Sequence, residues 1–370
     1  MFRFDRRLIL NFDLGLSVTI LLVAVIGLIN LFSATYVPGG GVPALFIKQL
    51  YYYLFGFIMI MVVVSVDYRN LLTLTYPAYG VVVLLLIYSL IFGSSVANTQ
   101  RWINLGFIRL QPSEPAKLAM VITMASYFSR RDTGQGFGFR ELIPPMLLTG
   151  VPFLLILKQP DLGTAMMMAV IFASMALFAK VRWRTLVTLG LVGLSVIPLA
   201  WIYVLKTYQK NRVLTLFDPT LDPQGTGYHI AQSKIAVGSG LMFGKGFLQG
   251  TQAHLEFLPE HHTDFAFSVW AEEWGFVGCL VFIACYSFML LAALRIAGGA
   301  RDKFGLLMAY GIAVLLFWQA FINLGMVMGL LPVVGMPLPL FSYGGSSLIT
   351  NLIGLGILIN IGMRRYQSGA

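Results

Sequence analysis

Residues 14–34 read LGLSVTILLVAVIGLINLFSA, an apolar run that contains no charged side chain. An α-helix needs about 20 such residues to cross the hydrocarbon core of a bilayer. The run is longer than the roughly 7 to 15 apolar residues of a secretory signal sequence, and it ends without a convincing cleavage site. It therefore predicts a retained membrane-spanning helix.

Similar runs follow along the whole chain. The 370 residues are 58% hydrophobic and 11% charged, with a mean hydropathy of +0.82, whereas about a quarter of the residues in a soluble domain are charged. This composition excludes an ordinary soluble protein and predicts an all-α integral membrane fold, with residues 1–370 as a single polytopic domain. About ten transmembrane helices are predicted, at 14–34, 46–66, 71–93, 113–129, 143–158, 162–180, 186–205, 264–293, 305–331 and 346–363.

The formal charge of +10 at pH 7 would suggest a nucleic-acid partner in a soluble protein. In a membrane protein, Lys and Arg collect in short cytoplasmic loops. With the N-terminus inside, most of the 25 basic residues fall in inner loops or at the two ends. We therefore expect both termini in the cytoplasm and no nucleic-acid partner. The other basic residues gather in outward segments with acidic and aromatic residues, which indicates an active extracytoplasmic face.

The largest outward segment is the loop of about residues 206–263, between the seventh and eighth spans, where hydropathy drops and Gly and Pro become frequent. A structureless loop of more than about 15 residues is usually functional or disordered. Residues 228–236 have helical periodicity, which argues against disorder. We expect an ordered outer loop with short interfacial helices.

Asp264 stands where this loop re-enters the membrane. Thr263 is a good helix N-cap, which would place Asp264 in the first turn, where the helix dipole lowers the pKa of a carboxylate. Desolvation by Phe265 and Phe267 would raise that pKa towards a value useful to a catalytic base. Helix capping and base catalysis both remain open.

A second cluster holds Arg101, Arg109 and the helix start Ser113-Glu114, followed by Lys117. Ser113 is a suitable cap, and Glu114 and Lys117 share a helix face three residues apart, so they could form an ion pair. Alternatively, Arg101, Arg109 and Lys117 offer cations to a diphosphate at the outer interface.

Three further segments contain residues that could serve either the fold or a functional site. Asp161 follows the tight turn Gln159-Pro160 and can cap the next helix or belong to a site. Glu272 and Glu273 would lie deep in the hydrocarbon, as a proton relay or as a structural network. The bend at 332–347, rich in Pro and Gly, predicts non-helical backbone that walls a cavity.

The remaining motifs limit the cofactors. His261 and His262 are adjacent and project in different directions, which disfavours a shared metal ion. The metal spacing HExxH, a Walker A sequence and a GxSxG turn are absent, which excludes the usual zinc proteases, P-loop pumps and serine hydrolases. No cofactor is required by the sequence.

Together, these residues closely resemble the SEDS family of bacterial shape, elongation, division and sporulation proteins. The motifs that carry the resemblance run from the third span to the last. They are Gln111-Pro112-Ser113-Glu114 with Lys117, Gln159-Pro160-Asp161-Leu162-Gly163, Gly227-Tyr228-His229 with Gln232-Ser233, Phe257-Leu258-Pro259-Glu260 with His262-Thr263-Asp264-Phe265, and Pro337 to Ser346.

The resemblance implies a peptidoglycan glycosyltransferase of the bacterial inner membrane that polymerises lipid II. The implied partners are lipid II, the growing glycan strand, a class B penicillin-binding protein and other membrane proteins of the elongation complex. The family's essential outer-loop aspartate corresponds to Asp264, and its Glu and Lys at the start of the fourth span correspond to Glu114 and Lys117. Segments 107–111 and 232–238 are more similar to elongation-type than to division-type members.

We hypothesise an inverting transfer in which Asp264 takes the proton of the acceptor GlcNAc 4-hydroxyl, which attacks the anomeric carbon of the donor MurNAc. Cations would stabilise the departing undecaprenyl diphosphate, and a divalent ion, Mg²⁺ or Mn²⁺, could share that task. The alternatives are a lipid II flippase, a division-type polymerase and a noncatalytic scaffold for wall synthesis. The substrate-binding candidates are Glu114, Lys117, Arg101, Arg109, Asp161, Arg212 and His262.

Overall fold

The computed structural model describes residues 12–365, except 97–98, 105, 107–108, 132–133, 135, 219–220, 223–224, 255–257 and 259. The motif residues Phe107, Ile108, Phe257 and Pro259 therefore lie outside the described residues. The elements are α2 (Leu14–Thr35), α3 (Ala44–Ser65), α4 (Asn70–Phe92), β1 (Ser94–Val96), β2 (Thr99–Asn104), β3 (Arg109–Leu110), α5 (Ser113–Ser129), α6 (Phe139–Lys158), α7 (Leu162–Phe178), α8 (Trp183–Leu199), the π-helical turn η1 (Ala200–Val204), α9 (Thr207–Phe217), α10 (Thr226–Ser239), α11 (Thr251–His254), α12 (Ala266–Gly298), α13 (Lys303–Val327) and α14 (Gly345–Arg364).

The helical membrane fold is confirmed. Each predicted span corresponds to a helix, and most of the predicted ends lie within a few residues of the observed ones. In the part of the chain that the structure describes, eight helices are long and apolar enough to cross a membrane. The other two predicted spans are α5 and α7, of 17 residues each. The protein is therefore a multi-pass membrane protein.

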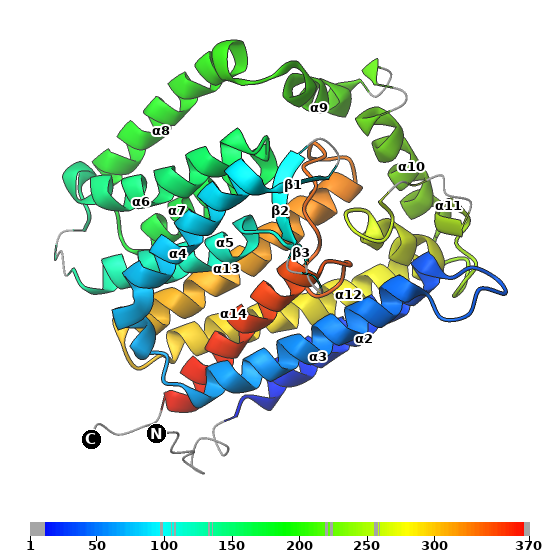
Figure 1. Ribbon diagram of the computed structural model, residues 1–370, viewed down its shortest axis with the longest axis horizontal. Coiled ribbons are helices and arrows are strands. Elements are labelled where there is room, and N and C mark those ends of the chain that lie inside the picture. The colour runs from blue at the N-terminus through cyan, green and yellow to red at the C-terminus, as the bar shows by residue number, and fades with distance from the viewer. Residues whose placement is uncertain are drawn as a thin grey trace.

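The centre of the bundle consists of α5, α13 and α14 (Figure 1). α14 is buried along nearly its whole length, and α3 packs along it. A Cβ atom on Gly56 of α3 would stand 2.2 Å from the Leu352 side chain of α14. The missing side chain lets the two helices approach closely, as small residues do in membrane bundles.

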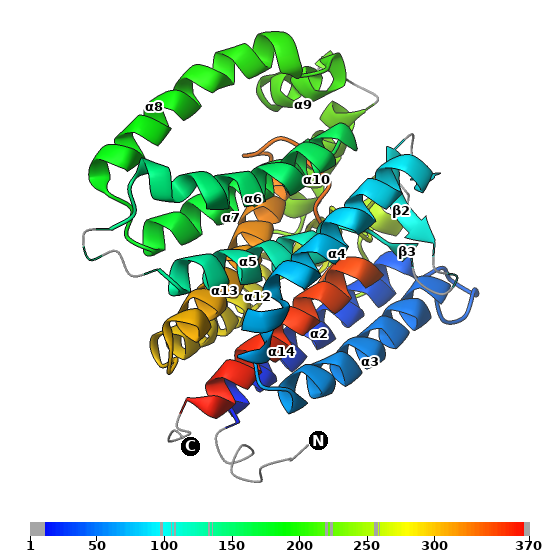
Figure 2. The same cartoon turned by 60° about the vertical axis from the view of Figure 1, so that its left-hand side comes forward.

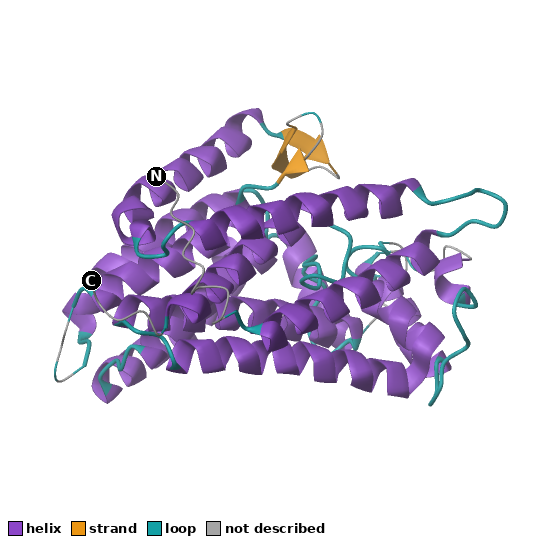
Figure 3. Ribbon diagram, turned by 90° about the horizontal axis from the view of Figure 1, so that it is seen from below, coloured by secondary structure: helices purple, strands orange, loops and turns teal. Residues whose placement is uncertain are grey.

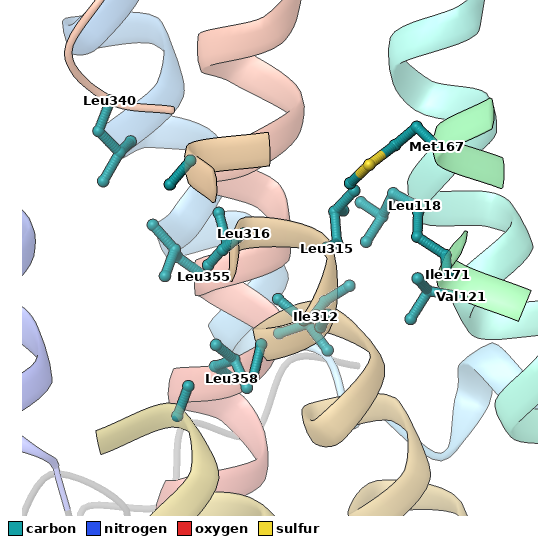
Figure 4. Close-up of a cluster of buried hydrophobic side chains, with 14 of the residues drawn as sticks. Leu118, Val121, Met167, Ile171, Ile312, Leu315, Leu316, Leu340, Leu355 and Leu358 are labelled. Atoms are coloured by element: carbon teal, nitrogen blue, oxygen red, sulfur yellow. The ribbon is translucent and has the colours of Figure 1, made fainter. Parts of the chain in front are cut away.

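The apolar core continues across α13. Ile312 and Leu315 of α13 face Leu118 of α5, and Leu316 lies beside Leu355 of α14 (Figure 4). By contrast, α8 stands apart from the bundle in both Figure 1 and Figure 2, and Thr185 is its one buried residue. Helices α5, α13 and α14 are therefore tightly packed, whereas α8 is not.

A small sheet was not predicted. β1, β2 and β3 form an antiparallel three-stranded sheet between α4 and α5 (Figure 3). β1 and β3 have three and two residues, too short for alternation to be recognised in a sequence, and the six residues of β2 do not alternate between apolar and polar side chains. The sheet matters because β2 carries Arg101 and β3 carries Arg109.

The prediction that residues 264–293 form one continuous spanning helix is wrong. α12 is broken at Gly275, which has a φ of 62°, a left-handed conformation that favours glycine. The segment before the break folds back on the segment after it, since the Phe267 ring lies 5.6 Å from the Phe282 ring and Trp270 Nε1 donates to Gly278 O at 3.0 Å. Residues 266–274 therefore form a short re-entrant helix.

The outer loop explains how the break is tolerated. Lys245 N and Gly246 N each donate at 3.0 Å to the carbonyls of Glu272 and Glu273, and Phe276 N donates to Leu241 O at 2.8 Å. The loop thus satisfies backbone groups that the break exposes, as non-helical backbone in a membrane protein requires. The expected short helices are also present, as α9, α10 and α11.

Candidate functional site

Asp264 lies at the inner tip of the re-entrant helix, outside its first turn. The N-cap of α12 is Phe265, which makes no side-chain cap hydrogen bond, so the expected capping by Thr263 is wrong. Asn323 of α13 donates from Nδ2 to Asp264 O at 2.9 Å and to Met336 O at 2.7 Å. This buried amide fixes the backbone of Asp264 against the loop between α13 and α14.

The carboxylate of Asp264 is half-buried, and no residue that the structure describes donates a hydrogen bond to it. The pKa of Asp264 is raised to about 7, mainly by burial and also by the negative charges of Glu260 and Asp161, while Arg212 opposes the shift. The desolvation expected from the neighbouring apolar residues therefore outweighs any effect that stabilises the ionised form. A carboxylate with this pKa suits proton transfer at neutral pH.

On one side of Asp264, a small pocket collects Arg101, Asp161 and Arg212. Arg101 Nε donates to Gln159 O at 2.8 Å, and its guanidinium lies 3.4 Å from Asp161 Oδ2. Arg212 Nη1 donates to Val333 O at 3.2 Å. Three residues that are far apart in the sequence are therefore brought together by the sheet, the α7 start and α9.

Asp161 itself has the capping role. Its carboxylate accepts from Thr164 N at 3.1 Å and from Thr164 Oγ1 at 3.0 Å, which confirms the cap interpretation. The following Gly163 packs so tightly on Val334 that a Cβ there would stand 2.8 Å from the Val334 side chain. The predicted wall is thus present: the loop after α13 contacts the α7 start, Arg212 and, through Gly335, Asp264.

His262, Tyr343 and Arg109 form a second group of polar residues. Tyr343 N donates to His262 O at 3.0 Å, and the two rings are 6.0 Å apart. Burial and the charge of His261 lower the pKa of His262, while Glu260 opposes them. Burial raises the pKa of Tyr343 to about 12, and Arg109, which is exposed, opposes this shift. Burial therefore favours the neutral form of His262, and the exposed Arg109 acts on its neighbour Tyr343.

Glu114 and Lys117 form a buried ion pair in the first turn of α5. Lys117 Nζ lies 2.8 Å from Glu114 Oε1, and the side chains are 1% and 4% exposed. The ion-pair interpretation is confirmed, whereas the N-cap of α5 is Pro112 rather than Ser113. Glu114 Oε2 has no hydrogen-bond partner among the described residues, so one acceptor remains in the interior.

Glu272 belongs to a structural network. Its Oε1 accepts from Lys245 Nζ, from Thr251 N at 2.9 Å and from Thr251 Oγ1 at 2.8 Å. Glu273 accepts from Ser33, near the outer end of α2. The expectation that both carboxylates lie deep in the hydrocarbon is wrong, because the re-entrant helix crosses the outer end of α2.

Sequence reasoning missed Asn323 as a residue of this site. The signal was present, because a polar amide within an apolar span is costly unless it is paired or functional. No group of three His, Cys, Asp or Glu side chains that could hold a metal ion occurs within the described ranges. Mg²⁺ can also bind through substrate phosphates with few protein ligands.

Comparison with known proteins decides the family. The sequence model of the FTSW_RODA_SPOVE family, described as cell cycle protein, matches residues 14–367. The chain belongs to this family. The resemblance to the SEDS family is thereby confirmed, and it extends over nearly all of the described residues.

Two curated family members are similar over most of their length. The peptidoglycan glycosyltransferase MrdB of Escherichia coli K12 is 43% identical over 295 residues, which cover 78% of this chain and 77% of MrdB. The probable peptidoglycan glycosyltransferase FtsW of Geobacter sulfurreducens strain ATCC 51573 is 38% identical over 325 residues, which cover 86% of this chain and 85% of FtsW.

Solved structures of the family agree with the fold. One, from a study of how a peptidoglycan synthase complex coordinates polymerisation and crosslinking, has a TM-score of 0.82 at 32% identity and covers 96% of this chain and 99% of that chain. The rod shape determining protein RodA of Thermus thermophilus has a TM-score of 0.72 at 30% identity, covering 96% and 98%. The family fold thus extends over the whole site.

Proposed function

We propose that the protein is a peptidoglycan glycosyltransferase of the RodA type, which polymerises lipid II during cell-wall elongation. The similarity to MrdB and RodA supports the reaction. The observation that carries the mechanism is Asp264: a half-buried carboxylate that accepts no hydrogen bond from a described residue and has a pKa raised to about 7.

In this mechanism, Asp264 is the general base. It removes the proton of the acceptor sugar's 4-hydroxyl as that oxygen attacks the anomeric carbon of the donor and the bond to the diphosphate breaks. A base whose pKa is close to the working pH is ionised in a useful fraction of molecules and still accepts the proton effectively. Attack opposite the leaving group inverts the anomeric carbon.

The leaving diphosphate gains negative charge in the transition state, so cations that contact it accelerate the reaction. Arg212 lines the pocket next to Asp264, and Arg109 is exposed and acts electrostatically on Tyr343. We assign these two residues to the diphosphate. Arg101 and Lys117, which hold Asp161 and Glu114, shape the site through their partners. His262 and Tyr343 are assigned to a sugar.

The polyprenyl chain of the substrate stays in the hydrocarbon. An apolar groove of about 220 Å³ lies between α3, α4, α5 and α14 near the α3–α4 turn, at the end of the bundle away from Asp264, so it would take the far end of such a chain. Leu71, Leu118 and Ile353 are among the residues that line it. The lipid hydrocarbon is as apolar as this groove, so packing contacts rather than exclusion of water would hold the chain there.

We further propose that the protein lies in the bacterial inner membrane with both termini in the cytoplasm, so that Asp264 faces the periplasmic side. A class B penicillin-binding protein is the proposed partner, together with other membrane proteins of the elongation complex. The similarity to a chain from a peptidoglycan synthase complex supports such a partnership. If a divalent cation takes part, we expect the substrate diphosphate to supply most of its ligands.

The lipid II flippase is less well supported by the contacts of the buried charges. A proton-coupled transporter would use carboxylates that change partners near the midplane. Glu272 is bound by Lys245 and Thr251, and Glu114 is paired with Lys117. Both carboxylates are held in fixed pairs, which suits a rigid site for chemistry.

The decisive test is polymerisation of lipid II by the purified protein, alone and with its penicillin-binding partner carrying an inactive transpeptidase. We expect glycan strands and release of undecaprenyl diphosphate. The same preparation is assayed in proteoliposomes for movement of lipid II across the bilayer. Transport without polymerisation, in the presence of the partner, would reject the glycosyltransferase and favour the flippase.

A further inference from the structure

A basic cavity lies at the opposite end of the bundle from Asp264. It has a volume of about 650 Å³ and is formed by the start of α4, the end of α5 and the start of α13. These helix ends lie together near the C-terminus, at the lower left of Figure 1. Four cations line the cavity, namely Arg69, Arg130, Arg301 and Lys303.

The cavity contains one carboxylate among its described lining residues, that of Asp302, and it is already engaged. Asp302 accepts from the Tyr68 hydroxyl, from Gly305 N at 2.7 Å and lies 3.4 Å from Arg69 Nε. It therefore caps α13 and neutralises one cation. The lining retains an excess of positive charge, and the N-terminus of the 25-residue helix α13 adds its partial positive charge.

Two of the cations are held in place by the protein. Arg130 donates to Leu72 O at 2.8 Å, and its guanidinium lies 5.9 Å from the Tyr76 ring centroid. Lys303 Nζ donates to Arg131 O at 2.9 Å. The guanidinium of Arg130 has further donors beyond these contacts. The cavity is therefore preorganised for an anion that accepts several hydrogen bonds, such as a phosphate.

We propose that this cavity binds the phosphate of an anionic phospholipid. The three helix ends that form it belong to the membrane bundle, so the cavity lies at the depth of lipid headgroups. Basic pockets between such helix ends bind phospholipid headgroups in other membrane proteins. Beside it, Leu74 and Tyr76 of α4 are 54% and 44% exposed, and they offer an apolar surface for the acyl chains.

The test compares lipid binding by the purified full-length protein. Native mass spectrometry from mixed micelles with equal amounts of phosphatidylglycerol and phosphatidylcholine measures the preference for the anionic lipid. A cation near a membrane surface is worth about 1 kcal/mol, or about fivefold in affinity. We expect Arg301→Gln to lower the preference about fivefold, and Arg130→Gln with Arg301→Gln to lower it by more than about tenfold.

Arg184→Gln is the matched control, because Arg184 is exposed at the start of α8 and does not line the cavity. It should keep the wild-type preference. Equal losses in the control and the cavity variants would overturn the proposal, since they would reflect net charge alone. An unchanged preference in the double variant would overturn it as well.

Two further arms separate the lipid from other anions. Inorganic phosphate in large excess should leave bound phosphatidylglycerol in place; complete displacement would identify a soluble anion site instead. A poly-glutamate peptide should not bind in a way that depends on Arg130 and Arg301. If it did, while the lipid preference was unaffected, the cavity would be a docking site for an acidic protein segment. None of these measurements depends on polymerase activity.

Discussion

Two aspartates that precede long helices have opposite surroundings. Asp302 directly precedes α13 and accepts hydrogen bonds from Tyr68 and Gly305 N beside its ion pair with Arg69. Asp264 precedes α12 by two residues, and its carboxylate accepts no hydrogen bond from any residue in the described part of the chain. The capping role that the sequence suggests for Asp264 is the role that Asp302 has.

The difference shows how one residue type serves structure or chemistry. The carboxylate of Asp302 accepts from several donors, whereas burial without donors raises the pKa of Asp264 to about 7. A carboxylate that receives no hydrogen bond from the protein can accept one from the substrate. Such an arrangement persists because other groups, here Asn323 on the backbone of Asp264, hold the residue in place.

The largest expected effect is that of Asp264→Asn. The amide has the same shape but cannot accept the proton, and a general base contributes about 10²- to 10⁴-fold to a rate. We expect polymerisation of lipid II to fall by about 10³-fold, measured with the penicillin-binding partner present. The melting temperature and partner binding should be unchanged. Normal polymerisation by this variant would show that Asp264 is not the base.

Asn323→Ala should weaken the placement of the same carboxylate. It removes the donor that holds the carbonyls of Asp264 and Met336, and a displacement of about 1 Å can cost about 10²-fold in rate. We expect kcat to fall by about ten- to a hundredfold with little change in KM for lipid II.

Gln319→Ala is the control for loss of a buried amide. Gln319 lies one turn earlier on α13, and its side-chain atoms have no hydrogen-bond partner among the described residues. It should reduce kcat much less than Asn323→Ala. A fall in melting temperature with unchanged kcat for Asn323→Ala would make Asn323 a purely structural residue.

Asp302→Ala tests the other side of the comparison. Loss of a helix N-cap costs about 0.5 to 2 kcal/mol, and Asp302 also accepts from Tyr68. We expect a lower midpoint of thermal unfolding, whereas Asp264→Asn leaves the midpoint within error. Asp302→Asn retains a capping oxygen and should recover most of the loss. Equal destabilisation by Asp264→Asn would remove the contrast between the two aspartates.

The smallest effects concern the pH profile. Because the base must be ionised, the rate should fall as the pH drops below about 7, the pKa of Asp264. Glu260 raises this pKa and Arg212 lowers it. Glu260→Gln should therefore move the acid limb of kcat/KM, which reports the pKa of the free enzyme, to lower pH, and Arg212→Gln should move it to higher pH, each by less than about one unit. Shifts in the same direction for both variants would contradict this electrostatic account.

Most of the fold was predictable from apolar runs. Segments such as 14–34 and 346–363 are long enough to span a bilayer and too apolar for another environment, so each one predicts its helix without knowledge of its neighbours. The ion pair of Glu114 and Lys117 was predictable because three residues on a helix share a face. The cap at Asp161 was predictable from the turn before it.

The re-entrant helix and the small sheet were not predictable. The segment 266–274 runs directly into the apolar stretch after Gly275, and Gly275 alone does not distinguish a break from a tolerated helical glycine. The break is stable because residues 241–246, which precede it in the outer loop, hydrogen-bond to its backbone. That partnership joins segments that are about 30 residues apart, beyond the range of local periodicity.

The sequence by itself determined that the protein is a membrane-embedded helical bundle and, through its motifs, which family it belongs to. The reason is that solvation in lipid acts on each segment independently. Only the tertiary structure decided that Asp302 receives hydrogen bonds on its carboxylate and that Asp264 receives none from the described residues. A pKa depends on the burial and charges that distant segments bring to a residue, and for Asp264 these come from α9, the α7 start and the loop after α13.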